Sequence, residues 1–380
     1  MRSKEALTLI IFFLIAEITI EALGENSTRY TYLLSYTLEN RGDEPYLLKE
    51  VEATFPMLQN NSWQNVRIVQ TTHPVAIKRV DVDGNRIAIL DLPQKIDPHS
   101  SLIFSIKYDI ESVDRSKTKI EPDEAGSFSD IPSELVEEFC VETETFTIGD
   151  EKVQALALRL TANETRTLGV VTRLLEWIID NVSYRAFEVP RYPNETLSSR
   201  EGDCDDQAIL LVTMCRATGV PAILQTGCLF DDGIEKAMSS WSGHLHIEQK
   251  GIGWHGWALV YIPPWGWLPI DLTYISLKNP ILRITNAPEH NNYIITGLNV
   301  SRQDYIREIY RRRELLISSK LYIRKSEISV RENSYFKFFE IYEQVTDIMG
   351  SLVVFIFSTF PVFFIIFETI IFFYCLLMLY

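Results

Sequence analysis

The chain has 380 residues, which predicts two globular units with accessory segments, because a typical domain has about 100–200 residues. Hydrophobic residues make up 46% and charged residues 23% of the sequence, and this composition excludes intrinsic disorder over most of the chain. With 36 basic and 51 acidic residues the formal net charge is −15, which excludes a general nucleic-acid binder, because phosphate contacts need a basic surface.

Both ends of the chain are apolar. At the N-terminus, Arg2 and Lys4 precede an apolar run of 11 residues at 6–16, so residues 1–25 are predicted to be a signal peptide or an uncleaved N-terminal anchor. Residues 348–380 are almost free of charge over 33 positions. They predict a C-terminal transmembrane helix, since about 20 apolar residues suffice to cross a bilayer.

The region between these ends is expected to face the exterior of the cell, on a protein held in the cell membrane. Basic residues before the first apolar run favour translocation of the downstream chain. A stretch at 302–325, with 8 basic and 3 acidic residues, points the other way, but its distance from the apolar segment weakens its influence. Acceptor triplets for N-glycosylation agree with an extracellular domain of a glycoprotein and lie at Asn26, Asn60, Asn163, Asn181, Asn194 and Asn299.

Residues 26–115 alternate apolar and polar side chains in short runs that are separated by turn residues. This pattern predicts an antiparallel β-sandwich domain. Residues 116–150 are expected to form an acidic linker with one short helix, because 121–151 carries 11 acidic and no basic residues. From 151 to 185 the apolar spacing becomes helical and predicts two helices. Residues 299–345 are expected to form a basic juxtamembrane segment of helix and strands.

Cys204 lies where a turn at Gly202 passes into a predicted helix. The unpaired amides and the dipole of a helix N-terminus favour a thiolate, which makes this cysteine a candidate nucleophile. Asp203, Asp205 and Asp206 oppose the thiolate by charge repulsion, so a nearby imidazolium would have to outweigh them.

Residues 254–273 are typical of a β-hairpin with its turn near Pro264, so His255 and Asp271 are expected on neighbouring strands. A carboxylate beside an imidazole fixes its tautomer and stabilises the imidazolium. Cys204, His255 and Asp271 together therefore predict a nucleophile, a base and an orienting group. Each residue alone is more often structural, and His244 and His246 are interpreted as structural. No closely spaced Cys or His set predicts a metal site, and no cofactor is expected.

These motifs resemble those of the transglutaminase-like superfamily, whose members have a papain-like cysteine fold. The similar segments are 202–208 (GDCDDQA), 216–222 (RATGVPA), 255–261 (HGWALVY) and 266–273 (GWLPIDLT), and Trp177, Asn181 and Tyr184 match a further helix end. The strict alanine after the histidine in the family is Gly256 here. The resemblance covers about 145–275 and implies a catalytic domain at 151–298 within an α+β chain.

The resemblance further implies that Cys204 attacks a peptide or side-chain amide to form a thioester acyl-enzyme. It also implies that the Cys204 amide donates to the oxyanion, while Tyr184 is a candidate second donor or, alternatively, a core aromatic. The expected function is a membrane-anchored cysteine protease or amidase, a hydrolase with a catalytic triad, that acts on peptide or protein substrates. Acyl transfer to amines is an alternative outcome of the same chemistry. The alternative from another class of protein function is a non-catalytic surface scaffold that binds partners through the β-sandwich.

Overall fold

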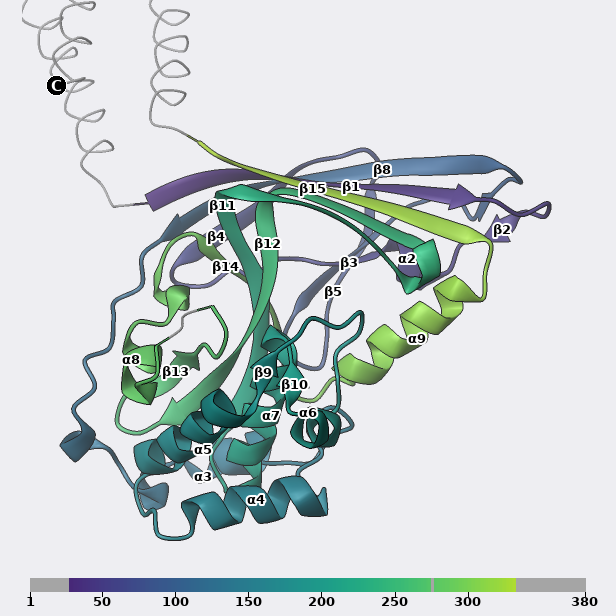
Figure 1. The fold of residues 1–380 in the computed structure, drawn as a ribbon. Helices are drawn as coiled ribbons and strands as arrows, with labels where there is room; N and C mark the ends of the chain where they lie inside the picture. The colour runs from purple at the N-terminus through teal and green to yellow at the C-terminus, as the bar shows by residue number, and fades with distance from the viewer. Residues whose placement is uncertain (1–26, 275–276, 333–380) are drawn as a thin grey trace, which may run out of the picture. The chain divides into compact units, whose positions relative to one another are not determined.

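A strongly curved β-sheet and a layer of helices make up the described part of the chain (Figure 1). The computed structural model describes residues 27–274 and 277–332. The helices are α2 (Glu50–Ala53), α3 (Ser133–Phe139), α4 (Glu151–Thr161), α5 (Thr167–Asn181), α6 (Pro193–Ser199), α7 (Cys204–Ala217), α8 (Pro280–Thr285) and α9 (Tyr305–Ile317). The strands are β1 (Ser27–Asn40), β2 (Tyr46–Leu47), β3 (Thr54–Pro56), β4 (Gln64–Thr71), β5 (Val75–Val80), β6 (Arg86–Leu90), β7 (Lys95–Ile96), β8 (Ser100–Val113), β9 (Ser183–Tyr184), β10 (Glu201–Gly202), β11 (Ala222–Ser240), β12 (Leu245–Ile262), β13 (Gly266–Ile270), β14 (Ile294–Val300) and β15 (Leu321–Arg331).

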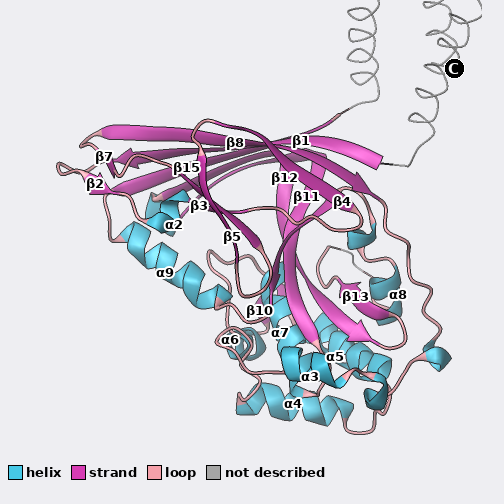
Figure 2. Cartoon of the chain, turned by 180° about the vertical axis from the view of Figure 1, so that it is seen from behind, coloured by secondary structure: helices cyan, strands magenta, loops and turns pink. Residues whose placement is uncertain are grey.

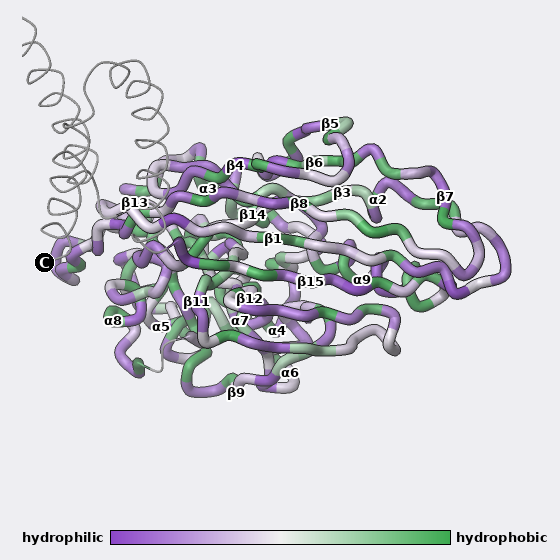
Figure 3. Tube along the Cα trace, turned by 90° about the horizontal axis from the view of Figure 1, so that it is seen from above, coloured by the Kyte–Doolittle hydropathy of each residue, from purple (hydrophilic) through white to green (hydrophobic). Residues whose placement is uncertain are grey.

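The main sheet has eight strands in the order β14-β11-β12-β15-β1-β8-β4, with β13 paired to β12. The strands β12 and β15 run parallel, and the other pairs in this sheet are antiparallel. Seen from above, β15, β1 and β8 lie side by side and mix hydrophilic and hydrophobic positions (Figure 3). The long strands β11 and β12 belong to both parts of the fold, because one half of each continues this layer and the other half runs toward the helices (Figure 2).

The predicted β-sandwich at 26–115 is not a self-contained domain. Its longest strands, β1 and β8, pair with each other, but β1 also pairs along most of its length with β15 from the far end of the described chain. One hydrophobic cluster joins Tyr32 and Phe104 of this region to Phe230 and Ile252 of β11 and β12. Alternation of apolar and polar residues predicts that a segment is a strand and which face is buried, but it does not specify the neighbouring strand. The small sheets β3-β6-β5 and β2-β7 complete the region.

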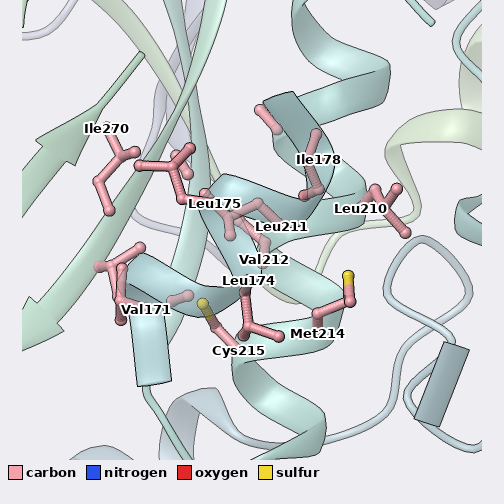
Figure 4. Packing of buried hydrophobic residues seen from close by; sticks show 14 of the residues in the cluster. Val171, Leu174, Leu175, Ile178, Leu210, Leu211, Val212, Met214, Cys215 and Ile270 are labelled. Carbon is pink, nitrogen blue, oxygen red and sulfur yellow. The ribbon is translucent and has the colours of Figure 1, made fainter. Parts of the chain in front are cut away.

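The helical layer is built around α5 and α7. Leu174, Leu175 and Ile178 follow the helical period and are fully buried. They lie beside Leu211 and Cys215 of α7 in the same cluster (Figure 4). Because α7 is buried over almost its whole length, the position of its first residue is fixed by packing against the sheet and α5.

Two segments that were expected to be accessory are part of this fold. In the acidic linker, α3 forms where the sequence predicts a helix, and Phe139 packs edge-on against Trp267 of β13 with ring centroids 5.1 Å apart. In the segment assigned as juxtamembrane, β15 lies inside the main sheet and α9 reaches the start of α7 through Tyr305. The basic residues of α9 form exposed ion pairs, such as that of Arg311 with Glu308, so the basic charge is that of a solvated helix face.

Within residues 27–274 and 277–332, no helix combines the length and the apolar character that crossing a membrane requires. The N-terminal segment 1–25 and the transmembrane segment 348–380 lie outside the described residues.

Candidate functional site

The first turn of α7 presents Cys204 at the first helical position. Asp203 is the N-cap, and its Oδ1 accepts a hydrogen bond from the Asp206 amide at 3.4 Å. Such a cap satisfies one of the free amides at a helix start. A side chain at Gly202 would place its Cβ 2.8 Å from the Cβ of Asp206, so the chain can only approach this closely with a glycine there. The predicted helix start is therefore confirmed at residue level.

The hairpin of β12 and β13 brings His255 and Asp271 together. The register pairs Ala258 with Ile270, which places Asp271 one residue beyond the end of β13. The His255 Nε2 atom is hydrogen-bonded to Oδ2 of Asp271. His255 is 7% exposed and Asp271 is fully buried. The two side chains that the sequence places on neighbouring strands are thus in direct contact.

Further hydrogen bonds hold the Asp271 carboxylate in place. Its Oδ1 accepts from the amides of Thr273 at 2.8 Å and Tyr274 at 2.7 Å. Burial by itself raises the pKa of Asp271, but the hydrogen bond and charge of His255 and the two amides outweigh it and lower the pKa overall. Asp271 is therefore a buried carboxylate whose charge is stabilised. No hydrogen bond reaches Nδ1 of His255 from the described residues, which leaves this nitrogen for a reacting group.

The Cys204 thiol lies next to strand β12 at Gly256, the residue that follows His255. The backbone amides of Gly256 and Asp205 lie near the sulfur and favour its thiolate form. A Cβ on Gly256 would lie 3.0 Å from the Cβ of Asp205 and 3.2 Å from its Cα. The glycine that replaces the alanine of the family motif thus allows α7 to sit tightly against β12, and the packing brings Cys204 to the strand that carries His255.

The electrostatic environment of Cys204 differs from the sequence-based expectation. Burial is the largest influence and raises the pKa of the thiol, and the charges of Asp205 and Asp203 raise it further. The amides of Gly256 and Asp205 oppose this rise and do not cancel it. A helix N-terminus alone would lower the pKa, but in this structure desolvation prevails. Burial therefore favours the neutral thiol of Cys204 over the thiolate.

The other carboxylates of this turn have structural partners. Oδ2 of Asp205 accepts a hydrogen bond from the Tyr305 hydroxyl at 3.1 Å, which ties α9 to the site. Oδ1 of Asp206 accepts from the Arg191 amide at 2.7 Å. Burial, followed by the charge of Asp203, raises the pKa of Asp206 to about 7. The acidic turn is therefore a hydrogen-bonded scaffold around the cysteine.

Tyr184 lies close to Cys204. Strand β9 pairs with β10 in parallel, and Tyr184 is the register partner of Gly202. Its side chain is 63% exposed, which excludes the alternative of a core aromatic. Partial burial of its hydroxyl is the main cause that raises its pKa. The hydroxyl is thus a protonated donor near Cys204.

Glu289 is a buried acid of this site that no sequence pattern predicts. It belongs to the short 3₁₀ helix Pro288–His290 and is fully buried. Its Oε1 lies 4.0 Å from Nε2 of His255. No sequence motif marks it, because it is an isolated glutamate 18 positions after Asp271, and only the tertiary fold brings it to the pair.

Two side-chain groups have the composition of metal ligands. Candidate ligand atoms lie within 4.8 Å of one another in Asp203, Cys204 and Asp205, and also in His255, Asp271 and Glu289. In the second group, the nitrogen and oxygen that would face a cation are already hydrogen-bonded to each other. His244 and His246 lie elsewhere: Nδ1 of His244 bonds the Leu321 carbonyl at 2.9 Å, and His246 bonds its neighbour on the strand, Glu248.

One known family profile matches the part of the chain that carries the site. Residues 154–272 match the profile of the transglutaminase-like superfamily, so this part of the chain is a transglutaminase-like domain. Among solved structures, a proposed cysteine protease from Cytophaga hutchinsonii is similar over 81% of this chain and 90% of its own, with 16% identity and a TM-score of 0.46. A proposed protease from Parabacteroides distasonis is similar over 74% and 69%, with 10% identity and a TM-score of 0.27. No curated protein matches the sequence.

Proposed function

We propose that the chain is a membrane-anchored cysteine enzyme of transglutaminase-like type that cleaves peptide or side-chain amide bonds, with hydrolysis as the main outcome. One arrangement carries the proposal: His255 is hydrogen-bonded to the buried Asp271, and the next residue on the strand, Gly256, meets the sulfur of Cys204. A nucleophile, a base and an orienting carboxylate on rigid elements are the parts that acyl transfer requires.

The raised pKa of Cys204 defines the order of proton transfers. Because the resting thiol is neutral, His255 takes its proton through Nδ1 as the sulfur attacks the amide carbonyl. The imidazolium that forms is stabilised by the Asp271 carboxylate at Nε2. His255 then gives the proton to the departing nitrogen, the C–N bond breaks, and an acyl thioester remains on Cys204. A water molecule, deprotonated by the same histidine, attacks the thioester carbonyl. The C–S bond breaks, the acid product leaves, and His255 returns the proton to the Cys204 sulfur.

The negative charge that develops on the carbonyl oxygen needs hydrogen-bond donors. The Cys204 amide is one proposed donor, since it belongs to the free amides at the start of α7. The Tyr184 hydroxyl is the proposed second donor, because it is protonated, partly solvent-exposed and close to the nucleophile. Exposure also favours hydrolysis over transamidation, because water is far more concentrated at an open site than any amine.

The cellular placement is part of the proposal. The apolar segments 1–25 and 348–380 are proposed to direct the domain to the exterior and to hold it in the cell membrane. Peptides or proteins at the cell surface are then the expected substrates.

Peptide profiling of the full-length chain in detergent, with and without an added primary amine, tests the activity. Mass spectrometry should detect cleaved amides in both conditions and an acyl adduct on Cys204. The Cys204→Ala variant serves as the matched control and should give neither. A chain that binds partners but shows no Cys204-dependent cleavage or adduct would instead be a surface scaffold.

A further inference from the structure

Glu289 is a buried acid beside the pair of His255 and Asp271. The residue is fully buried, and among the described residues no donor group reaches either of its carboxylate oxygens. Its Oε1 is nevertheless directed at the catalytic pair, 4.0 Å from Nε2 of His255. An ionised carboxylate in such a place would lose its hydration without compensation, which is among the most costly arrangements in a protein interior.

The neighbouring Asp271 has the opposite environment. Its two oxygens accept from the amides of Thr273 and Tyr274 and from His255. Two buried carboxylates side by side do not both ionise, and the one that accepts more hydrogen bonds keeps the charge. The shared proton therefore belongs on Glu289. The protonated Glu289 faces the carboxylate of Asp271. An oxygen of each side chain lies within 4.8 Å of the other.

The surrounding charges do not change this assignment. The positive charge of Arg115, which follows β8, lowers the pKa of Glu289. The two side chains form no ion pair, because the Arg115 guanidinium donates to the Ile294 carbonyl and the Thr296 hydroxyl. Arg283 on α8 acts on Asp271 and donates to backbone carbonyls. The other titratable groups near Glu289 are His290 and Tyr293 in the same segment. Burial lowers the pKa of His290 and raises the pKa of Tyr293 to about 12, so both side chains are neutral near pH 7.

We propose that Glu289 is a neutral carboxylic acid that donates a hydrogen bond to Asp271 and so positions the carboxylate that orients His255. In this role Glu289 acts through Asp271 as a positioning residue. This role rests on the function proposed above for Cys204 and His255. Burial is the main cause that raises the pKa of Glu289 well above its ordinary value, and the charge of Asp271 adds to it.

The first test observes the proton directly and does not depend on turnover. Infrared difference spectra in D₂O between the wild-type full-length chain and Glu289→Gln should show, at pH 7, the carbonyl stretch of a protonated carboxylic acid that the variant lacks. The same band should appear in a Cys204→Ala background. The band would therefore survive a failure of the proposed enzymatic function, whereas its absence at pH 7 would overturn the protonation of Glu289.

The second test measures positioning through the reactivity of Cys204 toward iodoacetamide, with unfolding checked by circular dichroism. Glu289→Gln keeps a neutral donor of the same shape, so its alkylation rate should stay within about threefold of wild type. Glu289→Leu removes the donor and should slow alkylation about 10–100-fold, the size expected for the loss of a hydrogen bond to a charged group. Equal losses in both variants, or none in either, would overturn the proposal. If Glu289→Leu does not fold, Glu289→Gln and the infrared band decide.

Discussion

The Trp254 indole donates a 2.8 Å hydrogen bond from Nε1 to Oε1 of Glu327. Trp254 directly precedes His255 on β12, and Glu327 lies on β15, between β12 and the N-terminal strands. Glu327 also accepts from the Tyr32 hydroxyl of β1 at 2.7 Å and from Gln249 at 2.9 Å. One buried carboxylate therefore connects the two regions that the sequence suggests are separate domains.

Removing this carboxylate is expected to destabilise the whole fold. Glu327→Ala leaves the Lys325 ammonium, only 19% exposed, without the oxygen that it contacts at 2.9 Å. Breaking a buried ion pair from one side costs about 3–5 kcal/mol. The measurement is the free energy of unfolding in urea. Glu314→Ala, which removes an exposed partner of Arg313, is the matched control and should change the free energy by less than about 0.5 kcal/mol. Equal effects of the two variants would contradict this role for Glu327.

The contribution of Glu327 to stability should depend on pH. Burial raises its pKa, but the charge of Lys325 and the hydrogen bonds from Lys325, Tyr32 and Trp254 outweigh it, so the folded pKa lies below the ordinary value of 4.5. The stabilisation is therefore complete above pH 4.5 and is lost as the pH falls through the folded pKa. Urea titrations from about pH 7 to about pH 3 should show the wild type losing its advantage over Glu327→Gln in the acidic range. A constant difference across that range would show that the two states titrate alike.

The sequence predicts the local parts of the site well. The turn at Gly202, the start of α7 and the hairpin that joins His255 to Asp271 each depend on residues close in the chain, so periodicity and turn signals are sufficient to place them. The pairing of β1 with β15 joins residues about 300 positions apart, and no local pattern encodes such a partner.

The sequence does not predict the electrostatics of the site. The position of Cys204 at a helix N-terminus suggests a lowered pKa, whereas burial and two aspartates raise it in the folded chain. The role of Glu289 is not predictable from the sequence for a related reason, since it depends on full burial beside Asp271. Both properties arise from desolvation, which only the tertiary structure determines.

The reactivity of Cys204 should follow its raised pKa. Alkylation by iodoacetamide should be slow near neutral pH and increase above pH 9.0, the ordinary value for a thiol, because only the thiolate reacts. Asp203→Asn removes one of the charges that raise this pKa, while asparagine still caps the helix. The alkylation profile of this variant should shift to lower pH. An unshifted profile would exclude the Asp203 charge as a cause, and fast alkylation of the wild type at neutral pH would exclude a neutral resting thiol.

The proposed location predicts which part of the chain an external protease reaches. When trypsin is added to intact cells that express the full chain, the region between the apolar ends should be digested, and the C-terminal segment should stay with the membrane. Antibodies to a tag at each end make the fragments visible on a gel. Complete protection in intact cells that is relieved on lysis would place the domain on the inner side.

The exchange Asp271→Asn should separate the proton-transfer step from folding. An asparagine can keep the hydrogen bond to Nε2 of His255 but carries no charge to stabilise the imidazolium. In serine triads this exchange lowers kcat about 10⁴-fold, and a thiolate formed in advance would reduce the loss because its proton has already moved. Since burial keeps Cys204 neutral, the loss here should approach the serine value and exceed about 10³-fold in kcat, with KM little changed. Steady-state kinetics on one amide substrate identified by profiling, beside Cys204→Ala and His255→Ala, measure it. A loss below tenfold in a folded Asp271→Asn chain would remove Asp271 from the proton-transfer step.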